Sequence, residues 1–312
     1  MVLDSSKSAA KASKASGRNI LKVKLDIIFK KLFSENEKLL TDLISSLLEI
    51  PIESIKNVKI KNSEVLPDSI EGKFVKMDLN MEVDGRLINI EMQYGKDYHY
   101  RERTLFYWSK LYSGELKSGE GFKDLKQSIC INIVNFPIFD CAEYHSHFAV
   151  MEKNRGEILT DKCAIHFFEL GKISRKANRS NKMELWLQLI NAETEEEFEM
   201  LNQTGIAPIQ EAVYIIYQMS EDEKIQEAAR LREKALHIEV TNMEGAKEEG
   251  LQEGLQKGLQ KGRQEGRQEG LKEGLKKGTV DVARRLLSRN RPIEEIAEDT
   301  GLTAEEIIAL LN

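Results

Sequence analysis

The sequence contains little cysteine and no long apolar run. Its three cysteines in 312 residues, Cys130, Cys141 and Cys163, are widely spaced and form no CxxC pair. That pattern is typical of reduced, buried thiols and argues against a disulfide framework or a structural zinc site. Because no apolar run approaches the roughly 18 residues needed to cross a bilayer, we expect a cytoplasmic protein with no membrane partner.

Basic residues do not outnumber acidic ones, so bulk charge gives no support for nucleic-acid binding. The chain has 46 Lys and Arg against 52 Asp and Glu, a formal net charge of −6. Phosphate contact needs Lys and Arg where the nucleic acid lies, so any such surface has to be a local basic patch. With 41% hydrophobic and 31% charged residues, the composition is that of a globular protein with a highly charged surface.

The first twenty residues also lack apolar character. Residues 1–20 are rich in Ser, Ala and Lys and contain no apolar segment like that of a secretory signal. A basic, Ser-rich start can also resemble an organelle transit peptide. We expect a disordered tail, because such a composition buries too little apolar surface to order the chain.

Helical and strand patterns follow one another in residues 21–205, which we expect to form one α/β domain. Apolar residues recur at helical spacing in residues 24–33 and 39–48. Residues 73–83 and 86–94 instead alternate apolar and polar side chains, as half-buried strands do. The same criteria predict an aromatic-rich helix at residues 100–116. They also predict three further strands, at residues 127–135, 144–152 and 163–170.

The two alternating runs are joined by Asp84-Gly85, a strong signal for a hairpin. This dipeptide favours a type I′ turn, in which both central residues need positive φ. A two-residue turn fixes the register, so that Asp78 lies opposite Glu91 and Lys76 lies opposite Gln93. Side chains directly opposite in an antiparallel pair have Cβ atoms about 4.5–5.5 Å apart. The hairpin therefore predicts two adjacent carboxyl groups.

Alternation along the strands sorts the hairpin residues into two faces. Asp78, Glu91 and Gln93 share one face, because successive side chains of a strand point to opposite sides. Like charges that face each other destabilise a sheet unless a cation neutralises them, and Mg²⁺ prefers one or two carboxylates with waters and phosphate oxygens. The alternative is an ordinary solvated face, which Asn80, Glu82 and Asn89 would share. The apolar residues Met77, Leu79, Ile90 and Met92 are predicted to face the core.

The order Asp78, then Glu91-Met92-Gln93, resembles the motif of the PD-(D/E)XK nuclease superfamily. It is most similar to the recombination-promoting nucleases and transposases of that superfamily, which often end the motif in ExQ. The resemblance includes the first helix, residues 26–33, the helix start at residues 100–103 and a glycine-rich tail, and it spans most of residues 20–312. It implies a restriction-endonuclease-like mixed sheet of about four strands flanked by helices, followed by helical C-terminal segments.

The resemblance also implies roles for particular residues. Asp78 and Glu91 would hold Mg²⁺, for which Mn²⁺ can substitute, and the backbone carbonyl of Met92 can add a ligand. Asp26 matches an acidic residue that often completes such sites, and its alternative is a carboxylate on a helix surface. Gln93 replaces the usual lysine; an amide can orient a water but brings no positive charge.

Two arginines are candidates for the missing charge. Arg101 and Arg103 follow the hairpin and would contact phosphate, unless they are simply solvated at a helix start. The expected function is a Mg²⁺-dependent DNA endonuclease in recombination or transposition. The alternative is a catalytically weak or inactive nuclease fold that acts as a DNA-binding or oligomeric interaction protein.

After a helical extension at residues 206–243, a repeat fills residues 244–278. Between Gly250 and Gly278 a glycine recurs at every fourth position. Each glycine costs about 0.8–1.0 kcal/mol relative to alanine in a helix, yet small residues four apart allow close helix approach. The repeat is therefore either a long helix that pairs with another copy to form a homo-oligomer or a partly flexible linker. The pattern of residues 279–312 predicts a small module of three short helices. Thr303 is expected to cap the third helix, in a capping box with Glu306.

Overall fold

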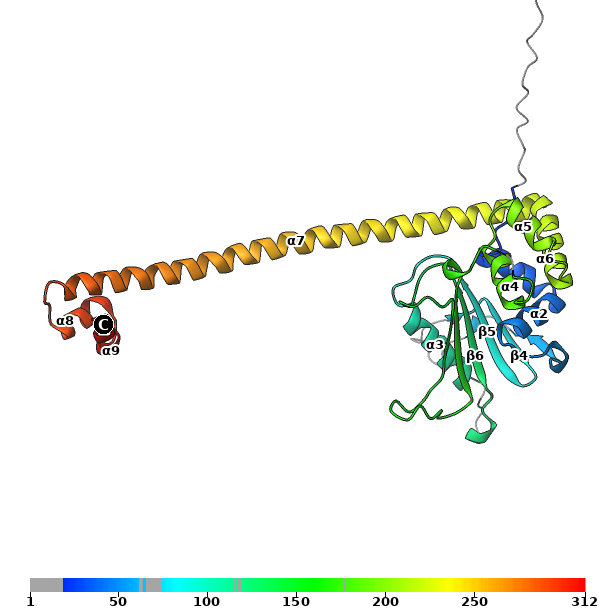
Figure 1. Cartoon of the computed structure of the whole chain (residues 1–312), viewed down its shortest axis with the longest axis horizontal. Helices are drawn as coiled ribbons and strands as arrows, with labels where there is room; N and C mark the ends of the chain where they lie inside the picture. The colour runs from blue at the N-terminus through cyan, green and yellow to red at the C-terminus, as the bar shows by residue number, and fades with distance from the viewer. Residues whose placement is uncertain are drawn as a thin grey trace, which may run out of the picture. The chain divides into compact units, whose positions relative to one another are not determined.

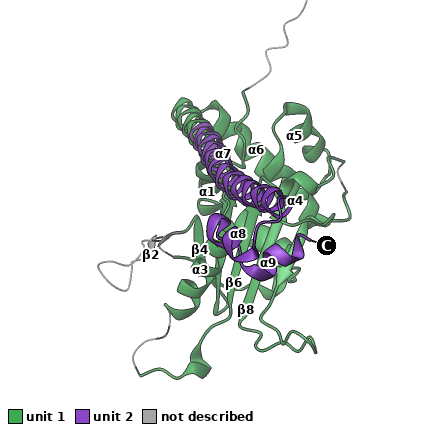
Figure 2. Ribbon diagram, turned by 90° about the vertical axis from the view of Figure 1, so that its left-hand side faces the viewer, with its two compact units in different colours: residues 1–240 green, residues 241–312 purple. Residues whose placement is uncertain are grey.

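The fold is that of a computed structural model, which describes residues 19–61, 64–65, 75–114, 116, 119–176 and 178–311. Residues 1–18 of the predicted tail lie outside the described residues, whereas Ile20 at its end is buried in the main core. The chain divides into two compact units, residues 1–240 and 241–312 (Figure 2). Within the described residues, no helix is both long and apolar enough to span a membrane.

The first unit is built on a six-stranded mixed sheet with the order β1-β4-β5-β6-β8-β7. β5, β6 and β8 run parallel to one another, while β4, β7 and the edge strand β1 pair antiparallel to their neighbours. The sheet is thus larger than the four strands that the resemblance implies: β7 lies within the predicted strand 144–152, whereas β1 was not predicted. The strands are β1 (Val58–Ile60), β4 (Leu79–Val83), β5 (Arg86–Gln93), β6 (Ser128–Val134), β7 (His145–Phe148) and β8 (Cys163–Glu169). A separate pair is formed by β2 (Glu64–Val65) and β3 (Val75–Lys76).

Helices cover both faces of the sheet (Figure 1). On one face, the apolar residues of β4, β5 and β6 pack with the helices that precede and follow the sheet in one large core. These helices are α1 (Asp26–Ser34), α2 (Glu37–Leu47), α4 (Lys182–Asn191), α5 (Glu195–Asn202) and α6 (Ala207–Glu221). On the other face lies α3 (Tyr100–Ser113), above a second cluster that includes Leu87, Cys130 and Phe167. β6 and β8 are buried along their whole length, as their apolar sequences predicted.

The hairpin of β4 and β5 has the predicted turn and register. Asp84 and Gly85 both have positive φ, 49° and 80°, as a type I′ turn requires. The pairing runs from Val83 opposite Arg86 to Leu79 opposite Ile90. The Asp84 carboxylate also accepts the backbone N–H of Asn57 at 3.0 Å, which ties the turn to the chain before β1.

The predicted strand 73–83 is interrupted at Met77 and Asp78, and two predictions are wrong as a result. Lys76 belongs to β3 and pairs with Glu64 rather than with Gln93. Met77 is buried in the cluster beneath α3 rather than in the main core. A bend at Asp78 separates the two strand segments, and it brings the backbone N–H of Asp78 to the side chain of Glu91.

The second unit contains most of the long helix α7 (Glu223–Leu287) and two short helices, α8 (Ile293–Thr300) and α9 (Ala304–Ala309). The whole glycine repeat is helical and forms part of α7. Thr303 and Glu306 form the predicted capping box. The first of the three predicted short helices is the end of α7, and it packs with α8 and α9 through Ala283, Ile296 and Ile307.

Candidate functional site

The carboxyl groups of Asp78 and Glu91 lie side by side where β4 begins and β5 ends. The backbone N–H of Asp78 donates to Glu91 Oε1 at 3.2 Å, and the backbone N–H of Met92 donates to Asp78 Oδ2 at 2.9 Å. Each carboxylate is therefore held by the backbone of the strand that carries the other. This arrangement follows from the hairpin register, since Asp78 is the next residue beyond the last pair, Leu79 with Ile90.

This face of the hairpin is not a solvated surface, so that alternative is wrong. Glu91 is 8% exposed and Asn89 is fully buried, and Asn89 Nδ2 donates to Glu91 Oε1 at 3.0 Å. Helix α3 closes over the face, because the hydroxyls of Tyr100 and Thr104 both donate to Asn132 Oδ1 on β6, at 3.1 and 3.0 Å. The two carboxyl groups consequently lie in a shielded environment.

Shielding from water changes the acidity of both carboxyl groups. Burial, together with the negative charge of Asp26, raises the pKa of Asp78 to about 6. Burial and the charge of Asp78 raise the pKa of Glu91 to about 8. A buried like-charged pair disfavours double ionisation, so without a cation the pair retains a proton near neutral pH.

The donor set suits a hard divalent cation. Asp78 Oδ1 and Glu91 Oε2 have no hydrogen-bond donor among the described residues, so one oxygen of each carboxylate is available. Nowhere among the described residues do three His, Cys, Asp or Glu side chains converge as a complete metal cage. Two carboxylates with waters and a substrate oxygen are nevertheless the usual environment of Mg²⁺, and the Asp78–Glu91 pair fits that ion.

The structure brings the four predicted catalytic residues to one cavity of about 170 Å³, which the predicted ligand Met92 also lines. Asp26, Asp78, Glu91 and Gln93 all contribute to its wall, together with Arg103. Asp26 comes from the first turn of α1, and its carboxylate is paired with Arg232 of α7 at 2.7 Å. The remaining residues of the wall are Met92, Tyr94, Gly95, Tyr107, Arg232 and Leu236.

The side chain of Gln93 links the end of β5 to α3. Its Nε2 donates to the carbonyl of Gly95 at 2.9 Å, and its Oε1 accepts from Arg103 Nη2 at 2.7 Å. Arg103 Nη1 also pairs with Asp97 at 2.9 Å. Its guanidinium lies 4.6 Å from the ring centre of Tyr100. The neutral amide thus holds a cationic side chain at the cavity.

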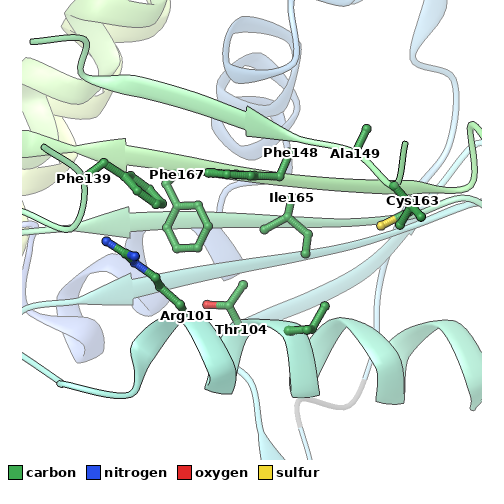
Figure 3. Close-up of a pocket in the computed structure, with 10 residues that line it drawn as sticks. Arg101, Thr104, Phe139, Phe148, Ala149, Cys163, Ile165 and Phe167 are labelled. Carbon is green, nitrogen blue, oxygen red and sulfur yellow. The ribbon is translucent and has the colours of Figure 1, made fainter. Parts of the chain in front are cut away.

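Arg101 lies apart from this cavity. It donates to the carbonyl of Ile138, and its guanidinium is 4.7 Å from the ring centre of Phe139. Figure 3 shows Arg101 and Thr104 projecting from α3 into a different pocket of about 240 Å³, lined mainly by apolar side chains that include Phe139 and Phe167. The two predicted arginines therefore line different pockets, and only Arg103 lines the cavity that holds Asp78 and Glu91.

One charged residue of the cavity was not predicted from the sequence. Arg232 is 206 positions from its partner Asp26, and no local spacing connects the two. The cysteine prediction is correct for Cys130 and Cys163, which are buried, and wrong for Cys141, which is exposed.

Comparison with known protein families gives one match. The family described as PD-(D/E)XK nuclease family transposase matches residues 23–246, a range that contains the whole cavity. No curated protein and no solved structure matches the chain.

Proposed function

The chain belongs to the PD-(D/E)XK nuclease family transposases, and we propose that it is a Mg²⁺-dependent endonuclease that hydrolyses phosphodiester bonds of DNA. Membership of this family implies a nuclease role in transposition. The observation that carries this proposal is the buried pair of Asp78 and Glu91, held by reciprocal backbone hydrogen bonds and with one open oxygen on each carboxylate. Such a pair is costly unless a cation neutralises it.

Asp78 and Glu91 would hold Mg²⁺, or Mn²⁺ in its place, with the carbonyl of Met92 as a further ligand. A bound divalent ion lowers the pKa of a water and stabilises charge that develops on phosphoryl oxygens. The protein contributes the shielded setting in which these charges interact strongly. Asp26 lines the same cavity and assists through its charge, which acts on Asp78.

Gln93 and Arg103 share the role of the lysine that ends the usual motif. Gln93 orients the attacking water through its amide oxygen, which has a second lone pair beyond the one used by Arg103. Arg103 carries the positive charge that the amide lacks, and its link to Gln93 keeps that charge beside the carboxylates. Arg101 would contact the DNA backbone outside the cavity.

Plasmid nicking tests this function. We expect purified protein to nick or cut supercoiled DNA with Mg²⁺ or Mn²⁺ but not with EDTA. Asp78→Ala and Glu91→Ala should each slow cleavage by about 10²-fold or more, because metal catalysis supplies several kcal/mol of transition-state stabilisation. Glu82→Ala is the matched control, since Glu82 lies on the same hairpin and pairs with Lys61 and Lys126 outside the cavity. Variants at Asp78 and Glu91 that cut as fast as wild type would contradict the assignment.

One observation favours the alternative, a nuclease fold that binds DNA or assembles without cutting. Both ends of the Gln93 amide already have partners, Gly95 and Arg103, which leaves less freedom to position a water. Cleavage separates the two functions. A protein that binds DNA and Mn²⁺ but leaves the plasmid intact would support the alternative.

A further inference from the structure

Arg232 presents a charged group to the cavity from a distant part of the chain. Its Nε donates to Asp26 Oδ1 at 2.8 Å and its Nη2 donates to Asp26 Oδ2 at 2.7 Å. The pair thus uses one edge of the planar guanidinium. Nη1 has no acceptor among the described residues, so the second edge is open, and the Arg232 side chain is 37% exposed.

The position of Arg232 is set by buried neighbours on the same helix. Ala229 and Leu236 lie three residues before and four residues after it, and both belong to the main core, with exposures of 5% and 7%. Residues at these spacings share one face of a helix. Leu236 also contributes to the cavity wall, and Glu233 pairs with Lys22 at 2.6 Å. This part of α7 therefore holds Arg232 against α1.

The carboxyl groups of the cavity wall would repel a phosphodiester anion unless a cationic side chain binds it. Three carboxyl groups, those of Asp26, Asp78 and Glu91, line a space that a phosphodiester anion would have to enter. Arg103 uses Nη1 and Nη2 on Asp97 and Gln93. Arg232 pairs with Asp26 through one edge of its guanidinium, and the other edge is open. Arg232 is therefore better placed than Arg103 to bind an incoming anion.

We propose that Arg232 binds the scissile phosphate of DNA and supplies there a second positive charge, in addition to the charge that Arg103 brings to the cavity. Asp26 is its positioning residue. The inference rests on the proposed nuclease function. A guanidinium held by a carboxylate on one edge can donate paired hydrogen bonds to phosphate oxygens from the other. Long-range folding would thus add, through a residue of α7, a phosphate-binding charge to the one that Arg103 supplies.

Salt-dependent DNA binding tests the contact without relying on cleavage. Binding of a short duplex is measured with Ca²⁺ in place of Mg²⁺ over a series of salt concentrations, and gels confirm that the duplex stays intact. Each phosphate contact contributes about 0.9 to the slope of log K against log salt. We expect Arg232→Gln to lower that slope by about one contact. Arg230→Gln is the control, because Arg230 is 65% exposed and pairs with Glu227.

A second variant separates phosphate binding from helix docking. Asp26→Asn breaks the same ion pair but keeps the arginine. If Arg232 only fastens α7, Asp26→Asn and Arg232→Gln should change the binding slope and the melting temperature alike. If Arg232 binds phosphate, Arg232→Gln should lower the slope by about one contact, whereas Asp26→Asn should keep most of the slope, because the amide oxygen can still accept a hydrogen bond from Arg232. In cleavage, Arg232→Gln should lower kcat by about 10²–10³-fold, the usual loss for one charge-stabilising donor, and Arg232→Lys should recover part of it.

The outcomes distinguish this inference from the function on which it rests. A wild-type slope for Arg232→Gln, in a protein whose wild type cuts DNA, would overturn the role of Arg232 and leave the nuclease assignment standing. If wild type neither cuts nor binds DNA, both proposals fail. If Arg232→Gln lowers the slope but wild type does not cut DNA, the phosphate contact of Arg232 would be supported and the nuclease activity would be contradicted.

Discussion

At the scale of residues, the site is defined by the burial of Asp78 and Glu91. Two carboxyl groups in a shielded place have three means of avoiding mutual repulsion: holding a proton, binding a cation or moving apart. Reciprocal backbone hydrogen bonds hold each side chain to the other strand. A shared proton or a bound cation remains, and the choice between them depends on pH.

The pH dependence of metal stabilisation follows from the raised pKa values. Both carboxyls have folded-state pKa values above the unfolded values of about 3.9 and 4.3. The stability that their protonated forms contribute is fully present below those unfolded values. It is lost as pH rises through about 6 for Asp78 and about 8 for Glu91. Metal binds the ionised pair and displaces these protons.

We therefore expect Mn²⁺ to raise the melting temperature more at pH 8 than at pH 6. Affinity should rise up to about tenfold per pH unit for each proton displaced. Differential scanning fluorimetry with MnCl₂ against EDTA measures this effect, and Glu91→Gln should abolish the Mn²⁺ shift because that variant lacks one of the two carboxylates that hold the metal. An equal Mn²⁺ shift at both pH values would contradict a metal that replaces protons on this pair.

The proximity of Asp78 and Glu91 could be predicted from the sequence because it depends on local rules. Asp84-Gly85 sets the turn and alternation sets the faces, so the register needed no information from the rest of the fold. The pairing of Asp26 with Arg232 could not be predicted in this way. It joins α1 to α7 over 206 residues, and only the packing of Ala229 and Leu236 in the core brings the two together.

At the scale of elements, the turn of the β4–β5 hairpin controls the geometry of the site. Gly85 has a φ of 80°, a region in which a side chain costs about 1–2 kcal/mol. We expect Gly85→Ala to lower the free energy of unfolding by about that amount and to weaken Mn²⁺ binding, since the turn sets the register between Asp78 and Glu91. Urea titration measures the first effect.

Gly171→Ala is the matched control for the turn. A Cβ at Gly171 meets open space, and its φ is not positive, so the change should stay within about 0.5 kcal/mol. Equal unfolding free energies for the two variants would show that the turn is not strained by a side chain.

The sequence predicted which central strands are buried better than it predicted the residues at which strands begin and end. Apolar runs correctly indicated the burial of β6 and β8, because burial on both faces leaves a strong compositional signal. The break at Met77 and Asp78 was missed, since the alternation continues through it. The pairing of β3 with β2 instead of β5 is a tertiary choice that alternation does not record.

At the scale of the whole molecule, the net charge of −6 does not describe the surface that would meet DNA. Arg103 and Arg232 both line the cavity beside the carboxylates. Local cations of this kind are what phosphate contact requires, and they are assembled from α3 and α7.

The glycine repeat of α7 is proposed to join copies of the chain. Leucines at four-residue spacing are exposed along the same segment, and their exposed fractions range from 56% to 72% at Leu251, Leu255, Leu259, Leu271 and Leu275. Small and apolar residues that recur every four positions wind slowly around a helix, which favours a right-handed pairing with a second copy.

Replacing glycines in the repeat distinguishes a contact surface from a linker. Gly258→Ala with Gly262→Ala should raise helix propensity by about 0.8–1.0 kcal/mol per position. If glycines allow close approach, the same changes should weaken self-association in sedimentation experiments. Gln260→Ala, between the two glycines, should leave it unchanged. Association of the double variant as tight as wild type would contradict pairing through this face.

The most direct measurement is calorimetric titration of Mn²⁺ into the protein at pH 8. We predict saturable binding by wild type and by Glu82→Gln, and loss of that binding in Asp78→Asn and in Glu91→Gln with the fold retained by circular dichroism. Binding of Mn²⁺ to Asp78→Asn and Glu91→Gln with wild-type affinity would contradict the metal site at this carboxylate pair, and with it the proposed nuclease mechanism.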